Sequence, residues 1–242
     1  MRWAAVSDIH SNLEALEAVL ADLERARPEA IVCLGDFVGY GGSPNECVER
    51  LRPRLAAAVV GNHDLAAIGG TRVDAFTGDA ARAARWTGTV LTAEHRDYLA
   101  ALPFSVVWRN ARLVHASPAR PERWAYVLSI EDATEEMGAY QEPLCLIGHS
   151  HYPGAFERDP SGTVRYSREP EIAMRSGRRY LVNVPSVGQP RDSDPRAGYL
   201  LVDEDAAALR QVRIAYDVEA AMRRIQDAGL PRFLSERLQW GE

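Results

Sequence analysis

The chain has 242 residues, of which 46% are hydrophobic and 26% are charged, and this is enough for a large domain with a substantial core. Its formal net charge of -6 argues against the broad basic surface that proteins binding duplex nucleic acid use. No stretch has the pattern of a signal peptide or the length of a membrane-spanning segment, so we expect a cytoplasmic protein that does not bind membranes.

We expect residues 1–242 to form a single domain, because no repeat, low-complexity tract or linker marks a boundary. The cysteines Cys33, Cys47 and Cys145 are odd in number, far apart and set in apolar surroundings. This pattern predicts reduced, buried thiols and no disulfide framework or thiolate metal site. The sequence leaves the oligomeric state open.

The first part of the chain predicts three strands that each end at polar residues. Apolar runs occupy residues 2–7, 31–34 and 56–60, and Asn12 opens a helix with one apolar face between the first two. The runs are followed by Asp8 and His10, by Gly35 and Asp36, and by Gly61, Asn62, His63 and Asp64. Open α/β sheets place their ligands at the carboxyl ends of strands, so these residues are candidates for a functional site.

Asp36 is the residue on which we expect the chemistry to converge. The run before it has no polar alternation, which is typical of a strand covered on both faces. Gly35 allows a tight turn and leaves room beside the acid. Taken alone, Asp36 would more simply cap the next turn or helix. Ser43 is a candidate N-cap for a second helix with Pro44 at its first position. The polar residues at the other strand ends favour the functional interpretation.

The middle of the chain repeats the same pattern. Residues 73–102 are predicted to be helical, and residues 104–108 and 112–114 to form a hairpin that ends at His115. A helix is expected at 130–140, and a buried strand at 144–147 ends at Gly148, His149, Ser150 and His151. Antiparallel strands are then predicted at 163–166, 180–184, 199–202 and 209–214, followed by a helix that Asp217 caps.

Five of the six histidines stand at predicted strand ends beside a glycine, an acid, an asparagine or another histidine, whereas His95 lies inside a helix. Each motif is weak alone, because a single histidine at a strand end is more often a hydrogen-bonded structural residue. Together they supply nitrogen and oxygen ligands and no thiolate, which suits two divalent ions better than a structural zinc. Mn, Fe, Ni, Co and Zn all accept such ligands.

The order and spacing of these motifs resemble the calcineurin-like metallophosphoesterase superfamily, and in particular its compact bacterial and archaeal phosphodiesterase branch, over residues 2 to about 190. The resemblance implies an α/β (α+β) fold, a four-layer αββα sandwich of two mixed sheets flanked by helices, with a two-metal site at one sheet edge. It further implies that Asp8, His10 and His151 hold the first metal, that Asn62, His115 and His149 hold the second, and that Asp36 bridges both.

Two ions roughly 3.5 to 4 Å apart can polarise one bridging water into hydroxide near neutral pH. We therefore expect a divalent-metal-dependent hydrolase that cleaves phosphodiester or nucleotide-type phosphate esters, a small substrate, by a metal-bridging hydroxide. The alternatives are a phosphomonoesterase and a catalytically weak scaffold that has kept the fold. A phosphoprotein substrate is disfavoured, because residues 36–41 lack the later Asp and Arg of the protein-phosphatase branch.

Two further residues are assigned through the resemblance. His63 matches the family's histidine that is not a ligand, and we expect it to act as a general acid or as a donor to the transition state. The alternative is that His63 only fixes Asn62. Arg191 follows a loop similar to one that faces the site in the compact branch, so it is a candidate for contacting phosphate. Its alternative is an ordinary surface arginine.

Overall fold

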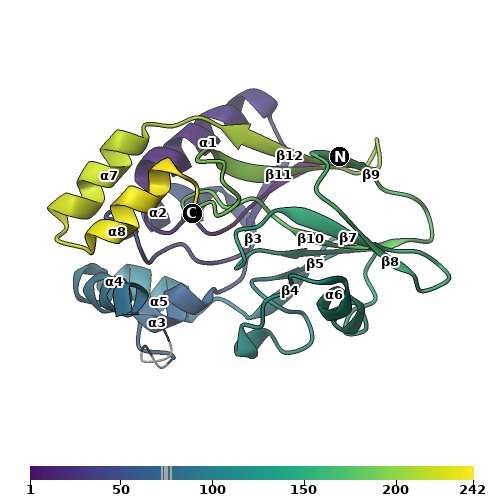
Figure 1. Ribbon diagram of the computed structural model, residues 1–242, viewed down its shortest axis with the longest axis horizontal. Helices are drawn as coiled ribbons and strands as arrows, with labels where there is room; N and C mark the ends of the chain where they lie inside the picture. Colours follow the sequence, from purple (N-terminus) through teal and green to yellow (C-terminus); the bar gives the residue numbers. More distant parts are fainter. Residues whose placement is uncertain (72, 74–75, 77) are drawn as a thin grey trace.

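The computed structural model describes residues 1–71, 73, 76 and 78–242, and its strands form two six-stranded mixed sheets. The sheets face each other with helices on their outer sides, as expected for the four-layer sandwich (Figure 1). In spatial order the first sheet contains β3 (Leu55–Ala58), β2 (Ala30–Cys33), β1 (Arg2–Val6), β11 (Ala197–Asp203), β12 (Ala208–Ile214) and β9 (Glu171–Ala173). The second contains β4 (Ser105–Trp108), β5 (Ala111–Val114), β6 (Leu144–Ile147), β10 (Arg179–Asn183), β7 (Gly154–Arg158) and β8 (Val164–Ser167).

The helices are α1 (Leu13–Ala26), α2 (Pro44–Leu51), α3 (Asn62–Ala67), α4 (Gly78–Val90), α5 (Ala93–Ala100), α6 (Ile130–Glu136), α7 (Val218–Asp227) and α8 (Arg232–Glu236). Short 3₁₀ turns occupy η1 (Arg52–Arg54), η3 (Pro121–Arg123) and η4 (Arg237–Gln239). In the part of the chain that the structure describes, no helix has both the length and the apolar character that crossing a bilayer requires.

Parallel pairing brings the functional loops to one edge. In the first sheet β1 pairs in parallel with β2, and β2 with β3. In the second sheet β6 pairs in parallel with both β5 and β10. The loop after β10 also joins the end of β1, because the Val187 N–H donates to the Ser7 carbonyl at 2.9 Å. The carboxyl ends of six strands therefore meet where the two sheets come together.

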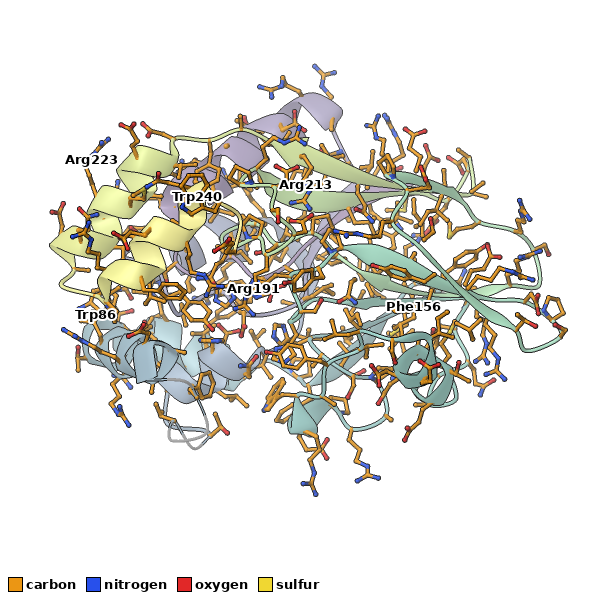
Figure 2. The ribbon with its side chains drawn as sticks, viewed as in Figure 1. Trp86, Phe156, Arg191, Arg213, Arg223 and Trp240 are labelled. Carbon is orange, nitrogen blue, oxygen red and sulfur yellow. The ribbon has the colours of Figure 1, made fainter. Side chains whose placement is uncertain are left out.

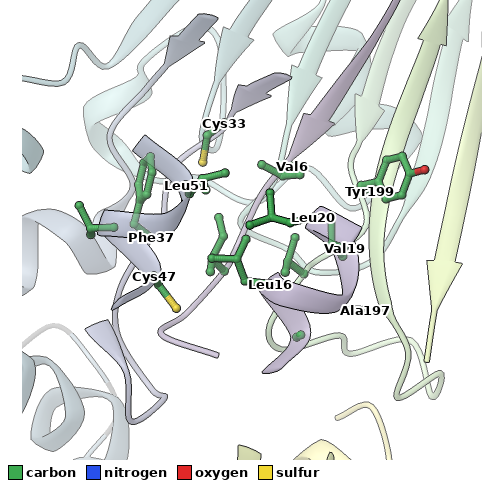
Figure 3. Close-up of a cluster of buried hydrophobic side chains, with 14 of the residues drawn as sticks. Val6, Leu16, Val19, Leu20, Cys33, Phe37, Cys47, Leu51, Ala197 and Tyr199 are labelled. Atoms are coloured by element: carbon green, nitrogen blue, oxygen red, sulfur yellow. The ribbon is translucent and has the colours of Figure 1, made fainter. Parts of the chain in front are cut away.

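The alternation of side chains along β1 divides the core into layers. Trp3 and Ala5 point between the sheets, whereas Ala4 and Val6 point outward, where α1 packs with residues such as Leu16 (Figure 3). The polar start of α1 is fixed by Asn12, whose side-chain oxygen accepts from the Ala15 N–H at 3.1 Å. Sheet and helix packing thus hold the loop between β1 and α1 at both of its ends.

Most predicted elements are confirmed, with some differences. The predicted helix at 73–102 is two helices, α4 and α5, and residues 74, 75 and 77 of that range lie outside the described residues. The helix expected at 130–140 ends at Glu136, and Ser43 precedes α2 without a side-chain capping bond. The later strands are not all antiparallel, because β10 also pairs in parallel with β6. Strands β7 and β9 and helices α3 and α8 were not predicted.

Candidate metal centre

Seven buried polar side chains converge at the edge where the parallel strands end. None of them is more than 7% exposed. Two sets of three offer ligand atoms that all lie within 4.8 Å of one another, namely Asp8, His10 and His151, and Asp36, His115 and His149. The seventh residue, Asn62, begins α3 and places its Oδ1 3.0 Å from the Nε2 of His115. The structure thus brings together every residue that the sequence predicted as a ligand.

The first group consists of Asp8, His10 and His151. The Nδ1 atoms of His10 and His151 bond to the carbonyls of Val38 and Gln189, and because a carbonyl only accepts, both Nδ1 atoms carry the proton. In neutral imidazoles the two Nε2 atoms then present lone pairs to each other at 3.1 Å. The Nε2 of His151 also lies 3.3 Å from Asp8 Oδ1. Two facing lone pairs and a nearby carboxylate oxygen repel one another unless a cation lies between them. These residues therefore fit a metal ion.

The second group contains Asn62, His115 and His149. The Nδ1 of His115 donates to the Leu34 carbonyl at 2.7 Å, which directs its Nε2 toward the centre. The ring of His149 is stacked on Tyr126, with centroids 4.2 Å apart and an interplanar angle of 18°. In the second group, His115 is therefore oriented by a hydrogen bond to a main-chain carbonyl and His149 by aromatic stacking.

Asp36 lies between the two groups. Its Oδ1 accepts the His63 N–H at 2.8 Å, whereas its Oδ2 lies 3.2 Å from His115 Nε2 and 3.6 Å from His10 Nε2. Among the described residues this Oδ2 has no hydrogen-bond partner, although it is buried. A buried carboxylate oxygen without a donor is costly unless a cation satisfies it. The position fits an oxygen that two cations share.

The backbone at the centre adopts a conformation that side chains usually avoid. Five of the seven residues, Asp8, His10, Asp36, His149 and His151, have φ between 49° and 63°. Such left-handed residues cost about 1–3 kcal/mol each and gather at functional sites. Local space is equally constrained, because a Cβ at Gly61 would collide with the Asp36 carboxylate and one at Gly148 with Ser7 and Asp8. The glycines of both motifs are therefore required by geometry.

Asp64 ties two of the site loops together. Its carboxylate accepts backbone N–H groups from Asp36 at 2.9 Å, from Val38 at 3.1 Å and from Gly61 at 3.0 Å. Burial, together with the charge of Asp36, raises the pKa of Asp64 to about 8, although the N–H groups of Gly61 and Val38 oppose this. Sequence analysis counted Asp64 among the candidate residues after the third strand but assigned it no specific role, because the only signal was an acid following the Asn62–His63 pair.

His63 faces the centre without joining either group. Its ring lies against those of Tyr40, Phe76 and His10, with centroid distances of 4.3, 4.8 and 4.9 Å. Its Nδ1 finds no hydrogen-bond partner within the described residues. Burial lowers the pKa of His63 to about 4, against the opposing effect of the Asp36 carboxylate. Aromatic packing thus orients this imidazole, and its Nδ1 has no acidic partner among the described residues.

A cavity of about 310 Å³ opens over the centre. Four of the predicted ligands, with His63 and Arg191, line it. Figure 2 shows Arg191 near the middle of the molecule, unlike Arg223, which projects from α7 at the periphery. The Nη2 of Arg191 contacts the Tyr40 hydroxyl at 3.4 Å and Gln189 Oε1 at 3.0 Å. The structure therefore places Arg191 at the cavity. The aromatic residues Trp124 and Tyr126, which also line it, were not predicted.

The fold and the paired histidine and aspartate groups agree with the sequence comparison. The profile of the calcineurin-like phosphoesterase superfamily domain matches residues 1–207, and the chain belongs to this superfamily. Members of this superfamily depend on metals, and the two groups of histidine and aspartate side chains could bind them.

The relatives cover nearly the whole chain. The uncharacterized protein MJ0912 of Methanocaldococcus jannaschii is 39% identical over 242 residues, which are 98% of this chain and 97% of that protein. A metallophosphoesterase from Sphaerobacter thermophilus is 39% identical, with all of both chains covered and a TM-score of 0.88. Hypothetical protein PH1004 from Pyrococcus horikoshii shares the fold at 21% identity, with a TM-score of 0.81 over 100% of this chain and 98% of that one.

Proposed function

We propose that the protein is a hydrolase that uses two divalent ions to cleave phosphodiester or nucleotide-type phosphate esters in the cytoplasm. The observation that carries this proposal is the buried Oδ2 of Asp36, which lies 3.6 Å from His10 Nε2 and 3.2 Å from His115 Nε2 and has no hydrogen-bond partner among the described residues. The three free, buried cysteines support a reducing compartment.

In this proposal Asp8, His10 and His151 would hold the first ion, Asn62, His115 and His149 would hold the second, and Asp36 would contribute to both. When bound, the ions supply positive charge that lowers the pKa of water and draws electron density from phosphorus. The main chain contributes orientation, because carbonyl groups hold three of the imidazoles with Nε2 toward the centre.

Two residues outside the ligand set act on the substrate. His63 lines the cavity beside Asn62, where its ring N–H can donate to the leaving oxygen or to a phosphoryl oxygen. Arg191 brings a guanidinium to the same cavity, and its buried Nε is free of partners among the described residues. A guanidinium can grip a phosphoryl group with two donors, so Arg191 binds the non-bridging oxygens.

The proposal is tested by assaying bis-p-nitrophenyl phosphate and p-nitrophenyl phosphate after loading with Mn, Fe, Ni, Co or Zn in turn. We expect hydrolysis with at least one ion and a preference for the diester. The Asp36→Asn variant serves as the inactive control. Faster hydrolysis of the monoester would point to a phosphomonoesterase. Bound metals without turnover of either ester would contradict the proposal and favour a scaffold that has kept the fold.

A further inference from the structure

The segment 124–126 covers the second group of ligands with aromatic side chains. The ring of Trp124 meets that of His115 edge to face, with centroids 5.9 Å apart, and Tyr126 stacks on His149. The next residue, Val127, is buried, and its carbonyl accepts from Asn183 Nδ2 at 3.2 Å. Both imidazoles of the second group are therefore backed by rings from one short, anchored segment.

Tyr126 keeps one face available. His149 stacks on one face of the Tyr126 ring, yet Tyr126 is 51% exposed. Tyr40 and Phe76 also line the cavity, but both rings pack on the ring of His63. Tyr126 lines the cavity, so its exposed aromatic surface offers apolar area that a planar ligand group can cover. The free face of Tyr126 is thus suited to stacking with a planar ligand group.

Two arginines line the cavity, Arg191 and Arg123, which precedes Trp124, and the two ends differ in the ring that each leaves exposed. Arg191 lies at the end near the first group, because its backbone N–H bonds to the carbonyl of His151 at 3.4 Å. Trp124 and Tyr126 lie at the end near the second group. The cavity, at about 310 Å³, is at the small end of the range for ligand pockets. A ligand with a phosphate at one end and a planar ring at the other matches both ends.

We infer that Trp124 and Tyr126 bind the base of a nucleotide substrate, so that the enzyme selects phosphate esters of nucleosides over esters of aliphatic alcohols. The inference rests on the proposed function for its reaction, but the ring site itself can be measured without turnover. Stacking on aromatic side chains tolerates different bases, because every base has a π face. The site therefore selects for a base without choosing among bases.

Binding is tested with two phosphonates, in which carbon replaces the ester oxygen and prevents hydrolysis, one related to adenosine 5′-monophosphate and one to ribose 5-phosphate. Titration calorimetry on the metal-loaded protein should show that the adenosine compound binds at least about fivefold more tightly. Tyr126→Ala should abolish most of this preference, and Tyr126→Phe should retain it. Tyr166→Ala, at an exposed tyrosine on β8 outside the cavity lining, is the matched control and should retain it too.

Turnover separates this inference from the proposed function. We expect a higher kcat/KM for a dinucleoside monophosphate than for glycerophosphoethanolamine, whose leaving group is also an alkoxide, and the difference should shrink in Tyr126→Ala. Absence of turnover with an intact, Tyr126-dependent binding preference would overturn the proposed reaction and leave the base site standing. Equal binding of the two phosphonates by the wild-type protein would overturn the base site, whatever the activity. So would a preference unchanged in Tyr126→Leu, which keeps an apolar side chain at this half-exposed position.

Discussion

The two groups of candidate ligands are built differently. In the first group, both imidazoles donate Nδ1–H to main-chain carbonyls, and Asp8, His10 and His151 are at most 2% exposed. In the second group, His115 has such a bond, whereas the ring of His149 is held by stacking on Tyr126. Asn62 and His149 are each 7% exposed and both line the cavity, whereas in the first group only His151 reaches it.

This difference indicates a division of roles between the two positions. The first group is oriented by the backbone before an ion arrives, so little freedom remains to be lost when the ion binds. The second group depends on side-chain packing and faces the space where a substrate would lie. We therefore expect the first ion to be held more tightly and the second ion to exchange more readily. Asp36 belongs to both groups and couples them.

The largest effect is expected from Asp36→Asn, which removes the charge that the two groups share. Asparagine can still accept the His63 N–H through its oxygen, so the loop should keep its conformation. Metal content should fall at both positions and hydrolysis should be lost, as measured by elemental analysis and by steady-state assay. Asp97→Asn, at an exposed acid on α5, is the control. Two retained ions with normal turnover would contradict the bridging role.

His63→Ala should leave both ions in place, because the side chain belongs to neither group, yet slow turnover by ~10²-fold or more. The loss should grow with the pKa of the leaving group if His63 donates a proton to the leaving oxygen. A loss that is constant across a series of leaving groups would instead indicate that His63 stabilises charge on the phosphoryl oxygens. A fall in metal content would show that His63 holds Asn62, and our placement of it would be wrong.

The smallest effect distinguishes the two ions directly. Equilibrium dialysis against increasing chelator should remove the second ion at a free-ion concentration about 10-fold higher than the first, which is the scale of losing an orienting contact. Activity should disappear when the second ion is removed, which is the first step of the titration. Asn62→Ala should make the second ion leave at a still higher free-ion concentration. The concentration at which the first ion leaves should not change. One common transition for both ions would show that the two positions do not differ in affinity.

The sequence predicted the ligand cluster well because its signal is local. An apolar run followed by glycine and a polar residue marks a strand end, and parallel pairing of such strands brings their ends to one edge. This applied to β1, β2, β5 and β6, which precede Asp8, Asp36, His115 and His149. The proposed roles of these residues in binding metals stay predictions.

The features that were missed depend on contacts distant in sequence. Strand β9 has one large apolar residue, Ile172, and its extended conformation comes from pairing with β12. Trp124 and Tyr126 stand in a segment without periodicity after a proline-rich stretch, and only the fold brings them to His115 and His149. The three bonds of Asp64 likewise join two loops that come together only in the folded chain.

The carbonyl groups that orient His10, His115 and His151 have a consequence for evolution. They belong to Val38, Leu34 and Gln189, and a point mutation there exchanges a side chain but leaves the carbonyl in place. The orientation of these imidazoles is thus encoded in the path of the backbone and not in the identity of a partner residue. Lineages can diverge at these three positions and still inherit the same ligand geometry, provided that the loops keep their conformation.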